Sequence, residues 1–197
     1  MINIAKDKVY ELESFKFYNY IDLSLDEKRL VLDMRNDPKV SGKMLNSEKI
    51  SLEDHLSFIE KLKERNDVFY WLIKKDGQPI GSFNVKILDT ENSIIDTGVF
   101  VFNTESEMKM LVNMFDISLA YHRLIFEQFN VEQINGEVAN ENLFVKQMDY
   151  FIGYKETNSD DKFTYIVLTE GDFSKQDFSE LTYKRFMKYY RENLIKH

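Results

Sequence analysis

Two β-rich runs around a tight turn constrain the fold most strongly. Residues 68–88 read VFYWLIKKDGQPIGSFNVKIL, with Asp76-Gly77 at the centre. Asp-Gly between two runs of β-branched and aromatic residues is a strong signal for a β-hairpin. The segment SIIDTGVFVF (93–102) then has the composition of a third strand. The middle of the chain is therefore predicted to form an antiparallel meander of three strands.

Helical spacing of apolar residues marks the segments on either side of this meander. The segments with such spacing are 25–35, 51–65, 108–129 and 143–152. Ser51 with Asp54 three residues later resembles a capping box, and Asn142 is a good N-cap. Gly153 fits the position just after a helix, where φ is often positive. Asp37-Pro38 predicts the end of the first helix, because the residue before proline avoids the α conformation.

Three further segments are expected to be strands, and the tail to be helical. The strands are 8–20, 132–139 and 163–169, and one or two helices are expected within 174–196. Mixed order of this kind predicts an α/β (α+β) fold with one mixed central sheet flanked by helices. We expect a domain over residues 1–170 and a helical C-terminal extension over 171–197.

Composition excludes several functional classes. The 197 residues have a net charge of −8, which argues against non-specific nucleic-acid binding. The three histidines are too scattered for a metal motif, and no cysteine is present, so no metal site is expected. No apolar run approaches the roughly 20 residues that span a bilayer. The start of the chain lacks the apolar region of a secretory signal, so we expect no membrane association and a cytoplasmic location.

The element order and two local patterns resemble the GNAT acyltransferase superfamily, over about residues 8–170. The first pattern comprises RNDPKVSGKM (35–44), ISLEDHLSFIEKL (50–62) and YWLIKKDGQPIGSF (70–83). It is similar to the branch that contains amino-sugar-nucleotide and ribosomal-protein N-acetyltransferases. The resemblance implies a GNAT-like sheet, acetyl-CoA as the acyl donor and a small primary amine as the acceptor, for example on an amino-sugar nucleotide. A homodimer is compatible with it.

The second pattern lies in the segment VANENLFVKQMDYFIGY (138–154). The family motif has Asn, then a small or apolar residue at +3, Leu at +6, Tyr at +7, Gly at +11 and an aromatic residue at +12. The matching residues here are Asn142, Val145, Met148, Asp149, Gly153 and Tyr154. Asp149 departs from the motif, because the family has a tyrosine there that protonates the leaving thiolate or orients the thioester.

The resemblance implies which residues bind acetyl-CoA. Asn142 would bind the pantetheine arm, although it can equally be only an N-cap. Main-chain groups of Val99, Phe100, Val101 and Phe102 would also pair with the arm. The glycine-rich pyrophosphate loop of the family corresponds to residues 103–118, most closely Lys109–Met114, where no glycine is present. Lys109 is the cation that could contact a phosphate there.

The candidate catalytic residues are His55, Glu137 and Asp149. An imidazole has a suitable pKa for a base, but a lone histidine on a helix is more often a surface or packing residue. Asp149 could donate a proton at neutral pH only if burial raised its pKa substantially; otherwise it is a solvated helix residue. Arg35 and Asn36 are candidates for acceptor binding, although Arg35 could instead hold a loop carbonyl.

Two functions fit these observations. One is an acyl-CoA-dependent N-acetyltransferase, and the other is a catalytically inactive protein that keeps the fold as a binding or interaction module. The missing glycines and Asp149 favour the second, but we favour the enzyme because acyltransferases of this fold can lack the tyrosine. The basic amphipathic tail is expected to dock on the body through its apolar stripe, or else to bind a membrane surface, a nucleotide or a partner.

Overall fold

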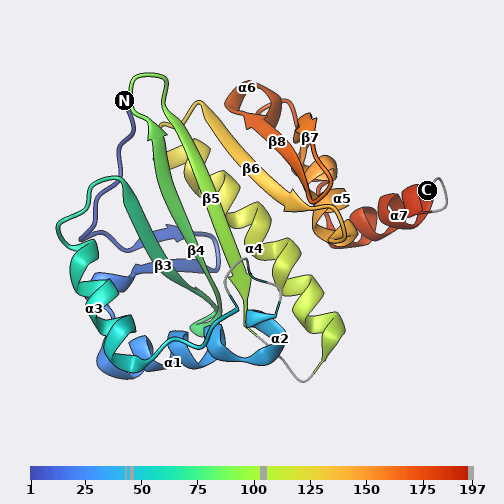
Figure 1. Ribbon diagram of the computed structural model, residues 1–197. Helices are drawn as coiled ribbons and strands as arrows, with labels where there is room; N and C mark the ends of the chain where they lie inside the picture. The colour runs from blue at the N-terminus through green and yellow to red at the C-terminus, as the bar shows by residue number, and fades with distance from the viewer. Residues whose placement is uncertain (43, 45–46, 103–105, 195–197) are drawn as a thin grey trace. The chain divides into compact units, whose positions relative to one another are not determined.

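The computed structural model describes residues 1–42, 44, 47–102 and 106–194. In this part of the chain, eight strands form one mixed sheet with the order β1-β2-β3-β4-β5-β6-β8-β7 (Figure 1). The strands are β1 (Tyr10–Leu12), β2 (Phe15–Asn19), β3 (Val68–Lys75), β4 (Gln78–Asp89), β5 (Ile94–Val101), β6 (Gln133–Ala139), β7 (Lys155–Ser159) and β8 (Phe163–Thr169). The helices are η1 (Tyr20–Asp22), α1 (Leu25–Asn36), α2 (Pro38–Ser41), α3 (Leu52–Leu62), α4 (Glu107–Gln128), α5 (Leu143–Ile152), α6 (Glu170–Phe173) and α7 (Tyr183–Leu194). The predicted fold class is confirmed.

The chain divides into two compact units. The first unit contains Met1–Ile2, Ile87–Thr97 and Ile125–His197, and the second contains Asn3–Lys86 and Gly98–Leu124. Strands β4 and β5 and helix α4 each contribute to both units.

The second unit contains the predicted hairpin. Asp76 and Gly77 have φ of 51° and 78° between β3 and β4, the positive values that a tight two-residue hairpin turn requires. The single strand expected over residues 8–20 is wrong: β1 and β2 form another antiparallel hairpin, with Glu13 at φ 52° in the turn. That turn contains no glycine, so the usual sequence signal for a tight turn is absent there.

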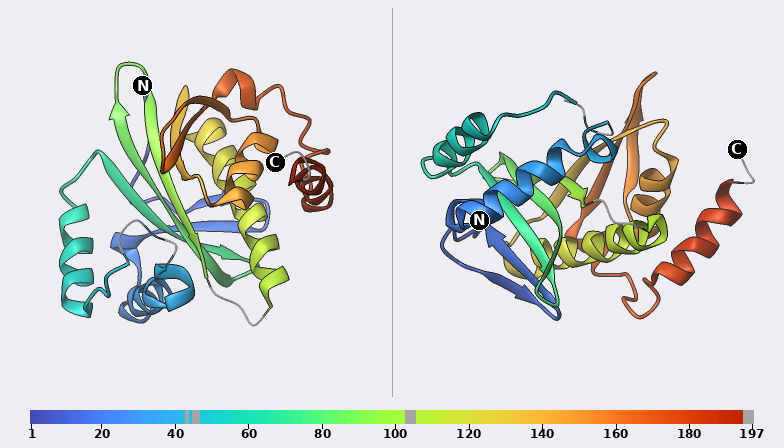
Figure 2. Two further views of the ribbon diagram at one scale, coloured as in Figure 1. Left: turned by 45° about the vertical axis from the view of Figure 1, so that its right-hand side comes forward. Right: turned by 90° about the horizontal axis from the view of Figure 1, so that it is seen from below.

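Helices cover both faces of the strands in the second unit (Figure 2). On one face, the ring of Phe83 stacks on Trp71 and on Tyr121 of α4. On the other face, Tyr20 and Leu72 belong to a buried cluster with Val31 of α1, Ile59 of α3 and other apolar residues. Residues that alternate along β3 and β4 therefore point into two separate apolar layers, as the pleat of a strand requires.

The predicted caps are present. Ser51 accepts a hydrogen bond from the Asp54 amide at 3.0 Å at the start of α3. Asp37 ends α1 directly before Pro38 and caps α2. These are local interactions within a few residues, which explains why the sequence alone predicted them.

In the first unit, β6 lies between β5 and β8 and pairs with both. Its residues Gln133–Ala139 pair antiparallel with β8, and Gln133–Asn135 pair in parallel with Ile94–Asp96 of β5. Strand β7, which was not predicted, pairs with β8 and is exposed at all five residues. Its polar sequence KETNS shows no alternation of apolar and polar residues, so no strand signal was available.

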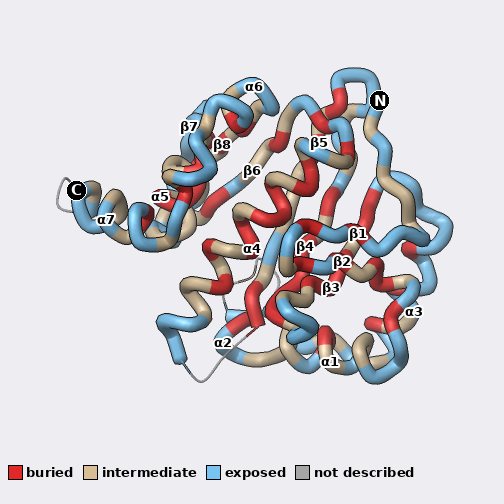
Figure 3. Tube along the Cα trace, turned by 180° about the vertical axis from the view of Figure 1, so that it is seen from behind, coloured by how far each residue is buried: buried red, intermediate tan, exposed pale blue. Residues whose placement is uncertain are grey.

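The C-terminal helix packs on α5, as its apolar stripe predicted. Phe186 of α7 is fully buried and contacts the rings of Phe144 and Phe151 of α5. Basic residues of α7 such as Lys184 and Lys188 are exposed, and Lys196 lies outside the described residues. Buried residues follow the strands and the inward faces of the helices in each unit (Figure 3). Within the described ranges, no helix is long and apolar enough to cross a membrane.

Candidate functional site in the first unit

The connection from β6 to α5 presents an asparagine amide at the start of the helix. Asn142 caps α5 by accepting a hydrogen bond from the Val145 amide at 3.5 Å. The Asn142 side chain is exposed, and its NH₂ group donates to none of the described residues. Its oxygen therefore caps the helix while its nitrogen remains available to a ligand.

Asn142 and Asp149 lie on one face of α5. They are seven residues apart, which corresponds to two helical turns and a rise of about 10 Å. Val145 lies between them on the same face, at the i+3 position of Asn142.

Asp149 is buried, with only 7% of its surface exposed. Burial raises its pKa from the ordinary 3.8 to about 8, because a charged carboxylate is poorly solvated in this position. The alternative that Asp149 is a solvated helix residue is therefore wrong. At pH 7 a carboxyl group with this pKa is about nine-tenths protonated. The side chain is therefore a neutral acid at pH 7 and can donate a proton. A pKa raised by burial was the condition that the sequence analysis set for this role.

The neighbouring Tyr150 is already engaged. Its hydroxyl donates to Glu156 of β7 at 2.6 Å. Burial and the adjacent Glu156 carboxylate raise the Tyr150 pKa further above its ordinary value. A phenol held by a carboxylate is a weaker proton donor, so Asp149 is the better acid of the two.

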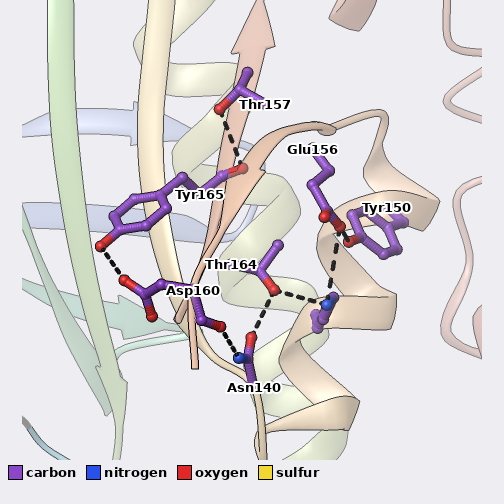
Figure 4. Close-up of polar contacts among 8 residues, drawn as sticks. Asn140, Tyr150, Glu156, Thr157, Asp160, Thr164 and Tyr165 are labelled. Carbon is purple, nitrogen blue, oxygen red and sulfur yellow. Dashed lines mark hydrogen bonds and ion pairs between the residues drawn. The ribbon is translucent and has the colours of Figure 1, made fainter. Parts of the chain in front are cut away.

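A set of polar contacts that the sequence did not reveal fixes α5 against β8 (Figure 4). Lys146 of α5 donates to Thr164 of β8 at 2.7 Å, and Thr164 donates to Asn140 at 2.7 Å. Asn140 in turn donates to the carbonyl of Asp160 at 2.8 Å. Because the partners are 18 to 24 residues apart, no local pattern could have identified them. They hold the helix that carries Asn142 and Asp149 in a fixed position.

Strand β6 has unpaired main chain beyond its contact with β5. Among the described residues, pairing with β5 ends at Asn135, whereas β6 continues to Ala139 with β8 as its partner on the other side. The main-chain groups of Gly136–Ala139 on the β5 side can therefore bind an extended ligand. Glu137 lies in this stretch, is exposed, and has Tyr165 as its cross-strand neighbour.

His55 belongs to the second unit and is 94% buried, since only 6% of its surface is exposed. Its ring contacts that of Tyr20, and its Nε2 bonds to no described residue. Burial lowers the His55 pKa, opposed by a hydrogen bond with the Lys28 backbone. The His55 ring is thus packed inside the second unit, which is the packing role that the sequence left open.

Arg35 and Asn36 hold the segment before α3. Asn36 donates to the carbonyl of Ile50 at 2.9 Å and accepts from its amide at 3.0 Å. Arg35 donates to the carbonyl of Glu48 at 3.3 Å, which is the loop-anchoring role considered for it.

The remaining predicted residues also lie in the second unit. Val99 is exposed, Phe100 is partly buried, and Val101 and Phe102 are buried. Residues 109–114 are helical and lie in the first turns of α4, at the start of the long helix where the resemblance places the pyrophosphate motif. Lys109 is exposed in the first turn, where its amide donates to Ser106. Residues 103–105, where that segment begins, lie outside the described residues.

The described side chains contain no group of three or more His, Asp or Glu residues placed to hold a metal ion.

No family model matches the chain. The chain is 26% identical over 161 residues to the acetyltransferase PseH of Campylobacter jejuni, which covers 80% of this chain and 95% of PseH. The crystal structure of that N-acetyltransferase in complex with acetyl coenzyme A has a TM-score of 0.62, with 18% identity, over 79% of this chain and 98% of that one.

Two other solved structures share the fold. FdhC, described as a nucleotide-linked sugar GNAT, has a TM-score of 0.69 at 17% identity and covers 91% of this chain and 98% of its own. A spermidine N-acetyltransferase from Vibrio cholerae, solved with CoA and spermine, has a TM-score of 0.67 at 11% identity over 83% of this chain and 100% of its own. At these identities, the structural matches establish the fold.

Proposed function

We propose that this chain, a member of the GNAT superfamily of N-acetyltransferases, transfers the acetyl group of acetyl-CoA to a primary amine, with an amino sugar linked to a nucleotide as the preferred acceptor. In support, the similar protein PseH is an N-acetyltransferase, and FdhC, which shares the fold, is a nucleotide-linked sugar GNAT. The observation that carries the proposal is the buried Asp149, which supplies an acid at the position where the family has a tyrosine.

The reaction requires attack of a neutral amine on the thioester carbonyl. A C–N bond forms, the C–S bond breaks, and the departing thiolate takes the proton of Asp149. A donor with a pKa of about 8 is well matched to a thiol, whose pKa is ordinarily about 8.5. The proton lost by the amine goes to Glu137, an exposed carboxylate on β6, and returns to Asp149 through solvent.

Acetyl-CoA is held mainly through neutral groups in this proposal. The Asn142 amide and the unpaired main chain of Gly136–Ala139 bind the pantetheine arm. The family resemblance also assigns main-chain contacts to Val99–Phe102 and a phosphate contact to Lys109.

The second-unit side chains have supporting roles. Arg35 and Asn36 remain the candidates for acceptor binding, and they also hold the carbonyl groups of Glu48 and Ile50 in the segment before α3. His55 packs α3, and Glu137 is the preferred base because its carboxylate is exposed. We further propose a cytoplasmic homodimer, no nucleic-acid or membrane partner, and a domain over residues 1–170 with a helical extension over 171–197.

The second candidate is an inactive GNAT-fold binding protein. The glycine-free sequence over 103–118, with Glu105 and Glu107, favours it because glycines allow the backbone to approach phosphates closely.

Calorimetric titration with acetyl-CoA separates the two functions. The enzyme should bind acetyl-CoA and release CoA thiol in the presence of an amine, which a thiol reagent detects without background because the chain has no cysteine. Asp149→Asn should keep acetyl-CoA affinity and lower kcat by about 10²-fold, the usual contribution of an acid or base. Absence of binding at millimolar acetyl-CoA would exclude the enzyme, and an unchanged kcat in Asp149→Asn would exclude Asp149 as the acid.

A further inference from the structure

Gly98 of β5 and Asn84 of β4 form an unusual contact in the second unit. A Cβ atom at position 98 would lie 2.7 Å from the Asn84 Oδ1 and 3.5 Å from its Cγ. The Asn84 carboxamide therefore lies directly over the bare backbone of Gly98, in space that any other residue would fill with its own side chain.

The Asn84 carboxamide is an available polar group. It is partly exposed, and it makes no hydrogen bond to any of the residues that the structure describes. Ser82, on the same face of β4, is different: it is buried, shares a hydrogen bond of 2.5 Å with the Tyr20 hydroxyl, and donates to the carbonyl of Trp71. The hydroxyl of Ser82 is thus already hydrogen-bonded within the protein. The carboxamide of Asn84 can offer a ligand both its NH₂ donor and its oxygen acceptor.

Aromatic rings flank this amide. Tyr70 is the cross-strand partner of Asn84 and is partly exposed, with its ring against those of Tyr20 and Phe58. Phe100, two residues beyond Gly98, packs against the same buried cluster as Tyr70. On this face of β3 and β4, the residues beside Asn84 include Lys86. On β5, Asp96 lies two residues before Gly98, on the same side of the strand.

We infer that Asn84, held in place by the absence of a side chain at Gly98, is the residue that binds the sugar of the proposed amino-sugar acceptor. A sugar hydroxyl can donate a hydrogen bond to the oxygen of a carboxamide and accept one from its NH₂ group. The apolar face of a pyranose ring packs on aromatic rings. A linear polyamine has only cationic donors, so it could use only the oxygen of the carboxamide. This inference rests on the proposed function and names a residue that selects its acceptor.

Steady-state kinetics with two probes test the assignment. UDP-glucosamine represents the amino sugars and spermidine the polyamines. Wild-type protein should acetylate UDP-glucosamine in preference to spermidine. Asn84→Ala should raise the KM for UDP-glucosamine about tenfold, the effect of losing neutral hydrogen bonds, and leave the KM for acetyl-CoA unchanged. Asn158→Ala, at an exposed asparagine of β7, is the matched control and should change neither constant.

A double-mutant cycle tests the contact itself. Gly98→Ala should displace the carboxamide and also raise the UDP-glucosamine KM, because the new Cβ needs the space of Oδ1. Combined with Asn84→Ala, it should add nothing further, since the group it displaces is gone. If Gly98→Ala acted only by weakening the fold, its effect on the UDP-glucosamine KM would add to that of Asn84→Ala in the double variant. That result would overturn the role of the contact.

The outcomes of these experiments are distinct. Failure to bind acetyl-CoA overturns the proposed function. Binding of acetyl-CoA with acetylation of spermidine in preference to UDP-glucosamine, or of neither probe, leaves the acyl donor assigned and overturns the sugar acceptor. Acetylation of UDP-glucosamine with an unchanged KM in Asn84→Ala overturns the role of Asn84.

Discussion

Replacement of Asp149 by asparagine should change how the stability of the protein depends on pH. Folding raises the Asp149 pKa from 3.8 to about 8. Below about pH 4 the carboxyl is protonated in both states, so the residue carries no charge penalty. Between pH 4 and 8 it is ionised only in the unfolded state, which favours unfolding increasingly as the pH rises. Above pH 8 the penalty is constant.

The magnitude follows from the size of the shift. Each pH unit in this window costs about 1.4 kcal/mol, so the penalty at pH 7 is about 4 kcal/mol. Asparagine has the same shape and does not titrate. The free energy of unfolding of Asp149→Asn minus that of wild type should therefore increase by about 1.4 kcal/mol per pH unit between pH 5 and 7. Any constant cost of burying the amide shifts this difference without changing its slope.

Urea unfolding of both proteins at pH 5, 6, 7 and 8 measures the difference directly. Asp161→Asn, at an exposed aspartate near β8, is the matched control and should run parallel to wild type across these values. If Asp149→Asn also runs parallel to wild type, the carboxyl is not protonated in the folded protein, and the argument for Asp149 as a neutral acid fails.

Three more predictions concern the same site and its support. The kcat of wild type should fall above about pH 8 as Asp149 loses its proton, and pH–rate profiles should show no such fall for the residual activity of Asp149→Asn. Asn142→Ala should weaken acetyl-CoA binding in calorimetry and lower stability by about 1 kcal/mol through loss of the N-cap; an unchanged affinity would remove Asn142 from the ligand site. Gly153→Ala should destabilise the protein by about 1–3 kcal/mol in urea unfolding, because φ is 120° and the new Cβ would lie 2.9 Å from Gln176; a stability equal to wild type would contradict this strain.

The helix and turn signals that succeeded are short in range. Ser51, Asn142 and Asp76-Gly77 act through hydrogen bonds or backbone angles within about three residues, so their effect is visible in the sequence. The apolar stripe of the tail similarly predicted that α7 would dock, and Phe186 is buried against α5. Strand β7 was missed because it is exposed at every residue and held only by pairing with β8.

Some features of the candidate site can likewise be seen in the sequence, and others depend on the fold. The spacing of Asn142 and Asp149 on one helix face, and the departure of Asp149 from the family motif, are properties of the sequence alone. The acidity of Asp149 is not, because its pKa depends on burial by the folded chain around it. The Lys146–Thr164–Asn140 contacts that hold this helix, and the seat of Asn84 over Gly98, likewise join residues 14 to 24 positions apart. The sequence determined which groups the protein has; only the tertiary structure decided which are solvated, which are already bonded, and which remain available for chemistry.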